Sequence, residues 1–146
     1  MNFFICPGAQ KAGTTLLYDI LRQHEEIQVS SKKETKYFLK EEKHISKEEY
    51  IKLFYSSDKD RKTEPLIYGE IDPEYLYFKD VPEKLFSTLG GDIKLIFLLR
   101  HPVDRAYSHY WMSYQRGFEL LDFEDAIASE SERFKSKDKI KHNGLA

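Results

Sequence analysis

The sequence predicts an α/β fold in three layers, with a parallel β-sheet flanked by helices on both faces. Two observations lead to this prediction. Short apolar runs typical of buried strands alternate along the chain with stretches of helical periodicity. Several of these runs end at proline, glycine or a charged residue, as strands do where they enter a loop. The chain has 146 residues, which fits one domain, so we expect a single domain over residues 1–146.

A strand, a loop and a helix open the chain. Residues 3–6 form an apolar run that stops at Pro7 and Gly8, which is typical of a buried strand. Residues 14–24 then show helical spacing, and Thr14 or a neighbour is the expected N-cap. The predicted inner face of this helix consists of Leu16, Leu17, Ile20 and Leu21.

The middle of the chain is more polar. We expect a short strand at 27–29 and a loop at 30–36. Ser46 and Glu49 form a capping-box pattern, which predicts the start of a second helix. Residues 56–65 are predicted to be a charged loop.

Two more strands and three more helices follow. Residues 66–71 form a candidate strand, and Asp80 is the expected cap of a helix that Gly90 and Gly91 close. Residues 94–99 are the clearest candidate for a buried strand. The inner face of the helix after Asp80 is expected to hold Leu85, Phe86 and Leu89. Further helices are expected from Pro102 to Gly117 and from Asp122 onward.

Composition limits the function. Lys plus Arg number 23 and Asp plus Glu 25, so the net charge is -2, which excludes a globally basic nucleic-acid binder. Cys6 is the only cysteine, which excludes an internal disulfide and a cysteine-rich zinc site. The five histidines lack metal-ligand spacing, so no metal is predicted. No apolar run approaches the roughly 20 residues of a membrane span. We therefore expect no membrane partner and a cytoplasmic location.

Gly8 and Gly13 have the G-x4-G spacing of a phosphate-binding loop, between a predicted strand and a predicted helix. Glycines let consecutive N–H groups point inward, and the helix adds the positive end of its dipole. Thr14 stands where a Walker A motif has its lysine, and Lys11 lies inside the loop instead. The pattern predicts an anion site. The structural alternative is a tight turn with a solvated lysine.

A second candidate anion site follows the run at 94–99. Arg100 comes directly after this run, and Ser108 lies about two helical turns further along. A guanidinium can hold a phosphate through two bonds, and a hydroxyl can donate another. Two anion sites on one edge of a sheet suggest a ligand that is phosphorylated at both ends. The alternative is that Arg100 pairs with a structural carboxylate.

Three segments carry a resemblance to a known family. Residues 8–15 resemble the 5'-phosphosulfate loop of sulfotransferases that use 3'-phosphoadenosine 5'-phosphosulfate (PAPS), and residues 100–108 resemble their 3'-phosphate motif. Residues 33–38 are similar to the Lys-Glu-Pro-His-Phe-Phe segment of the branch that contains the heparan sulfate and bacterial carbohydrate-type enzymes. The resemblance implies a P-loop-like fold and covers residues 3–146.

The resemblance implies transfer of a sulfuryl group from PAPS to a hydroxyl or amine of a small molecule or glycan, without a metal. Lys11 is then the residue that stabilises the leaving phosphate, and Glu34 is the residue that takes the acceptor proton. Arg100 and Ser108 would hold the 3'-phosphate. The residues implied in holding the 5'-phosphosulfate, beside Lys11, are Gly8, Gln10, Ala12, Gly13, Thr14 and Thr15.

The chain also departs from the family pattern. The family segment Gly-Glu-Lys-Ser-Pro, whose lysine is catalytic, is Gly-Glu-Ile-Asp-Pro at 69–73, and Ile71 cannot supply a cation. Lys11 then acts alone, or activity is weaker. Catalytic domains of the family are longer, so we expect the N-terminal, donor-binding portion of a domain that is incomplete at its C-terminus.

Two alternatives stay open. One is a P-loop kinase or ATPase, which would need magnesium to bridge its phosphates. The other is a truncated, non-catalytic nucleotide-binding fragment, which would self-associate through an open sheet edge.

Overall fold

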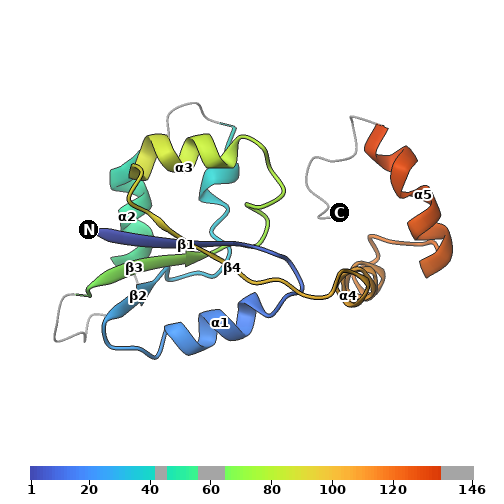
Figure 1. Cartoon of the computed structure of the whole chain (residues 1–146), viewed down its shortest axis with the longest axis horizontal. Coiled ribbons are helices and arrows are strands. Elements are labelled where there is room, and N and C mark those ends of the chain that lie inside the picture. Colours follow the sequence, from blue (N-terminus) through green and yellow to red (C-terminus); the bar gives the residue numbers. More distant parts are fainter. Residues whose placement is uncertain (42–45, 56–64, 136–146) are drawn as a thin grey trace. The chain divides into compact units, whose positions relative to one another are not determined.

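A computed structural model describes residues 1–41, 46–55 and 65–135. The chain divides into two compact units, Met1–Leu99 and Arg100–Ala146, and each is described by itself. The first unit holds the sheet, and the second holds two helices (Figure 1). The single domain expected over residues 1–146 stays a prediction.

The described sheet has four parallel strands in the order β2-β3-β1-β4. Its register pairs Cys6 with Ile71 and Val29 with Gly69. All four strands point the same way, so their carboxyl ends share one edge of the sheet. The strands are β1 (Asn2–Gly8), β2 (Ile27–Val29), β3 (Ile67–Ile71) and β4 (Lys94–Phe97).

Helices cover both faces of this sheet, which confirms the predicted three-layer α/β fold (Figure 1). The residues of β1 alternate between the faces, because successive side chains of a strand point in opposite directions. Phe3 and Ile5 belong to one core cluster, and Phe4 and Cys6 belong to the other. The first cluster includes α2 (Lys47–Tyr55), α3 (Val81–Leu89) and the short 3-10 helix η1 (Tyr37–Leu39); the second includes α1 (Thr14–Leu21).

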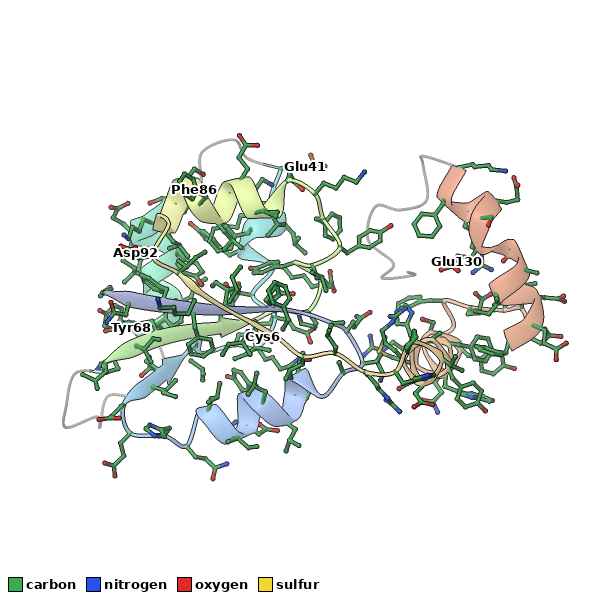
Figure 2. The ribbon with its side chains drawn as sticks, viewed as in Figure 1. Cys6, Glu41, Tyr68, Phe86, Asp92 and Glu130 are labelled. Atoms are coloured by element: carbon green, nitrogen blue, oxygen red, sulfur yellow. The ribbon has the colours of Figure 1, made fainter. Side chains whose placement is uncertain are left out.

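The α2 face is built largely from aromatic rings. Tyr50 is fully buried, with its ring centroid 4.9 Å from that of Phe38 and 5.3 Å from that of Phe54. Burial of such rings is the main source of apolar stabilisation in a small unit. Tyr68 of β3, labelled in Figure 2, closes the cluster against Phe54.

The predicted inner face of α1 is half wrong. Leu17 and Leu21 pack on the sheet, whereas Leu16 and Ile20 are 65% and 55% exposed. The buried stripe instead contains Thr14, Leu17, Tyr18 and Leu21, an i, i+3, i+4, i+7 pattern that includes two residues with polar groups. The prediction placed only aliphatic residues on the inner face, so the predicted face is rotated about the helix axis relative to the observed one.

The helix starts also differ in part from the expectation. Gly13, the neighbour of Thr14, occupies the N-cap position of α1, within the expectation that Thr14 or a neighbour would do so. Asp80 precedes α3 but makes no side-chain cap; its carboxylate pairs with Lys84 at 2.7 Å. Ser46 does accept the Glu49 N–H at 3.3 Å, as the capping box requires. On α3, Leu85 and Leu89 are buried as expected, but Phe86 is 67% exposed.

β4 is not the buried strand that its apolar run predicted. Leu95 and Phe97 are each 49% exposed. Among the strands described, β4 pairs with β1 alone and lies at the edge of the sheet. An edge strand has a neighbour on one side only, so its side chains are less covered than those of β1.

The second unit consists of α4 (Pro102–Gln115) and α5 (Phe123–Lys135). A helix starts at this point as the sequence predicted, and Asp122 caps it by accepting the Asp125 N–H at 2.9 Å. Phe123 packs edge-on against Tyr107 and Tyr110 of α4. The charged loop expected at 56–65 lies, apart from Pro65, outside the described residues.

Candidate active site

Three segments of the first unit meet at the carboxyl edge of the sheet. The loop after β1 leads into α1, the turn after β2 carries Glu34, and the end of β3 lies between them in the sheet. Cys6 (Figure 2) lies near the end of β1, where its carbonyl accepts the N–H of Asp72 at 3.1 Å. Burial raises the pKa of the Cys6 thiol, and the backbone groups of Gly8 and Leu98, together with the charge of Lys33, oppose this rise.

Gly8 anchors the loop after β1. Its carbonyl accepts the Leu98 N–H at 2.9 Å, and the next residue, Ala9, donates to the Leu98 carbonyl at 2.7 Å. A Cβ on Gly8 would lie 3.0 Å from the Cβ of Leu76, and its φ of +155° is rare for other residues. This close approach explains why the loop needs a glycine here.

The loop reaches α1 through two left-handed residues, Lys11 at φ 66° and Gly13 at φ 96°. Over residues 13–21, all of which are described, α1 has no side-chain cap and no acidic residue in its first turn. Its first N–H groups have no partner within the helix and carry the positive end of the dipole. The loop therefore fits an anion better than a cation.

The other loop residues differ in their surroundings. Gln10, Lys11 and Ala12 are half-buried, and the Ala12 N–H donates to the Ala9 carbonyl at 3.2 Å. Thr14 is buried, whereas Thr15 is exposed. All seven residues that the sequence predicted around the 5'-phosphosulfate lie in this one loop and the first turn of α1, and their contact with a donor stays a prediction.

Glu34 lies in a turn that is bound to the end of β3. Its N–H donates to the Ile71 carbonyl at 3.3 Å, and its carboxylate forms an ion pair with the Lys33 ammonium. The backbone is left-handed at Glu34 (φ 60°) and again at Lys36 (φ 57°). Such residues cost roughly 1 kcal/mol or more each and persist only where contacts hold them.

A buried carboxylate supports this turn, and sequence reasoning missed it. Glu70 of β3 is fully buried and accepts hydrogen bonds from Tyr50 at 2.8 Å, from Tyr75 at 3.0 Å and from Thr35. Burial raises the pKa of Glu70 to about 7, although the three hydroxyls oppose this rise. A glutamate inside an otherwise apolar strand was the signal that could have identified it.

Asp72 holds the other side of the turn. Its carboxylate accepts the N–H of Lys36 at 2.8 Å and that of Glu74 at 3.2 Å. Burial raises the pKa of Asp72 to about 6 against the effect of these two bonds.

Arg100 and Ser108 belong to the second unit. Arg100 is exposed and precedes α4, and Ser108 is half-buried in the second turn of that helix. The predicted approach of Arg100 to the Lys11 loop stays a prediction.

No family model matches the chain. It is 35% identical over 97% of its length to the membrane-associated sulfotransferase kil1 of Dictyostelium discoideum. It is 29% identical over 80% of its length to heparan sulfate glucosamine 3-O-sulfotransferase 3A1 of Mus musculus. A sulfotransferase from Alicyclobacillus acidocaldarius has a similar structure, with a TM-score of 0.71 and 30% identity over 92% of this chain. The chain belongs to the sulfotransferase family.

This sulfotransferase-family chain spans 33% of kil1, 28% of the mouse enzyme and 58% of the bacterial one. The relatives named here are all sulfotransferases and lend no support to the kinase or ATPase alternative.

The predicted cytoplasmic location is wrong, because kil1, a relative over nearly the whole chain, is a membrane-associated protein. The prediction rested on composition: no apolar run reaches the length of a membrane span, and a single cysteine cannot form an internal disulfide in any compartment. Neither observation reports on location. In the part of the chain that the structure describes, no helix combines the length and apolar character that crossing a bilayer requires.

Proposed function

We propose that the protein transfers a sulfuryl group from PAPS to a hydroxyl or amine of an acceptor. The observation that carries this proposal is the arrangement at the carboxyl edge of the sheet. The start of α1 has no side-chain cap and follows Lys11, whose backbone is left-handed. The neighbouring strand β3 ends in Ile71, whose carbonyl accepts the N–H of Glu34. Family membership supports the same reaction.

The roles follow from the chemistry of each group. The loop at 8–15 holds the 5'-phosphosulfate through its N–H groups and the helix dipole. The acceptor oxygen or nitrogen forms a bond to sulfur as the bond from sulfur to the phosphate oxygen breaks. Glu34 takes the acceptor proton, and Lys11 balances the charge on the departing phosphate. The leaving group is adenosine 3',5'-bisphosphate.

Arg100 and Ser108 are proposed to bind the 3'-phosphate of the donor. A guanidinium and a helical hydroxyl suit that group. A carbohydrate is the proposed acceptor class, since the mouse relative is named for its action on heparan sulfate glucosamine. The Lys33 side chain, which is largely buried beside Glu34, provides positive charge near this acceptor end.

Calorimetric titration tests the donor assignment. Adenosine 3',5'-bisphosphate should bind more tightly than ATP, and added magnesium should not change its affinity. Transfer of labelled sulfate from PAPS to a panel of glycans then tests the reaction. Tighter, magnesium-dependent binding of ATP would show that the protein handles nucleoside triphosphates instead.

A further inference from the structure

The turn that carries Glu34 is attached to β3 along the whole end of that strand. The contacts alternate between backbone and side chain, and none involves the loop at 8–15. They are Ser30 N–H to Gly69 O at 3.0 Å, Thr35 Oγ1 to the Glu70 carboxylate, Glu34 N–H to Ile71 O at 3.3 Å, and Lys36 N–H to Asp72 Oδ2 at 2.8 Å.

Two of these contacts hold Thr35 and Lys36, the two residues that follow Glu34 in the strained stretch of backbone. Glu34 and Lys36 are both left-handed, with Thr35 between them. Residues other than glycine leave this region when their surroundings do not fix them. Thr35 is therefore the point where a side-chain contact can decide whether the turn keeps its shape.

Using Glu70 for that contact costs folding free energy. It is fully buried, and hydroxyl groups donate to it: Thr35 from the turn, Tyr50 from α2 and Tyr75 from the segment after β3. A buried carboxylate held by hydroxyls alone costs folding free energy, and an apolar residue would fill the same place at lower cost. A costly buried group that fixes a strained turn beside a candidate base points to a functional purpose.

We propose that Glu70 is a positioning residue for Glu34, acting through the Thr35 hydroxyl, with Asp72 holding the following residue. This inference rests on the proposed function. The segment 69–73 in this chain then acts as a clamp for the turn, and Ile71, which is fully buried, contributes its carbonyl rather than a cation.

The clamp has a pH dependence. The titratable groups that face Glu70 are Asp72, which follows β3, Tyr50 from α2 and Tyr75. Lys36, Glu74 and Glu34 surround Asp72. A protonated Glu70 accepts the Thr35 hydroxyl less strongly, because a neutral carboxyl is a weaker acceptor than a carboxylate. Turnover should therefore rise with pH through about 7, the pKa of Glu70.

Thr35→Val and Glu70→Gln test the clamp in the whole chain. Each should lower kcat ten- to a hundredfold, because small displacements of a reacting group have effects of this size. The KM for PAPS and the Kd for adenosine 3',5'-bisphosphate should stay within about twofold of the parent, since the 8–15 loop is untouched. Thr35→Ser keeps the hydroxyl and should restore kcat. In Glu70→Gln the rise of kcat near pH 7 should disappear.

Tyr68→Phe is the matched control, since it removes a buried hydroxyl from the same aromatic cluster and the same strand. It should leave kcat within about twofold. Loss of kcat in Tyr68→Phe equal to that in Thr35→Val, or parent-like kcat in both Thr35→Val and Glu70→Gln, would overturn the proposal.

A second readout does not depend on turnover. The Tyr37 N–H donates to Thr35 Oγ1 at 3.1 Å, so its amide resonance should titrate near pH 7 in the parent and not in Glu70→Gln. A parent that neither binds the bisphosphate nor transfers sulfate refutes the proposed function. The clamp is then judged by this resonance alone, and an unchanged titration in Glu70→Gln refutes it.

Discussion

Lys11 is the proposed cation of the donor-binding loop. It adopts a left-handed backbone within a loop that is fixed at one end by Gly8 and at the other by the start of α1. Lys11→Ala should weaken adenosine 3',5'-bisphosphate binding by about 1–3 kcal/mol, the range of a lost charged hydrogen bond. Calorimetry measures this change. Lys47→Ala, which removes an exposed lysine from α2, should bind as the parent does.

Glu34 should affect turnover and leave donor binding intact. Glu34→Gln keeps the side-chain shape but cannot take a proton, so kcat should fall by about a hundredfold or more. The affinity for the bisphosphate, measured in parallel, should change little. Equal losses in affinity and kcat would show that Glu34 contacts the donor rather than the acceptor.

At the level of elements, the Phe4 ring of β1 lies over Gly69 of β3, so that this position requires glycine. A Cβ on Gly69 would lie 1.8 Å from the Phe4 ring, which occupies the paired position in the register. Gly69→Ala should destabilise the protein by about 1–3 kcal/mol or more, because the strands or the ring must move. Urea unfolding measures the loss. At Gly91 the nearest atom lies at 3.4 Å, so Gly91→Ala is the control and should be nearly neutral.

Local patterns predicted most of the elements. The strand at 2–8, the glycine loop and the capped helices after Ser46 and Asp122 depend on residues within a few positions of one another, and such signals are visible in sequence. The exposure of β4 depends instead on its place at the sheet edge. An apolar run does not encode which strand lies beside it, so the prediction of a buried strand failed.

The candidate site was predictable to the same extent. The 8–15 loop is one contiguous segment, so its residues were found together. Glu70 accepts hydrogen bonds from Thr35, Tyr50 and Tyr75, which lie in separate segments of the chain. The order of these residues in the sequence does not indicate that they are in contact. Glu34 itself was identified only by resemblance to the family segment, because its local sequence does not distinguish it from other glutamates in loops.

Across the whole molecule, the buried carboxylates should make stability depend on pH. The pKa of Glu70 rises from 4.5 to about 7 on folding, so the folded protein binds the proton more tightly than the unfolded chain. The stability contributed by this group is fully present below about pH 4.5 and is lost as the pH rises through 7. The difference is on the order of 3 kcal/mol. Asp72, with its pKa raised from 3.8 to about 6, acts in the same direction.

Glu70→Gln should therefore flatten the pH dependence of the unfolding free energy. Urea titrations of parent and variant at pH 5 and pH 8 measure this. The parent should lose more stability than the variant between the two pH values, since the amide does not titrate. An identical loss in both proteins would mean that folding does not raise the pKa of Glu70, so that its carboxylate is already ionised in the folded protein at pH 5.

The attachment of the Glu34 turn to one strand end has a consequence for engineering. A selection for heat tolerance at alkaline pH would reward neutral replacements at position 70, which remove a fully buried carboxylate. The same replacements would release the turn. Laboratory evolution toward thermostability should thus yield heat-stable proteins that still bind the nucleotide but transfer the sulfuryl group slowly.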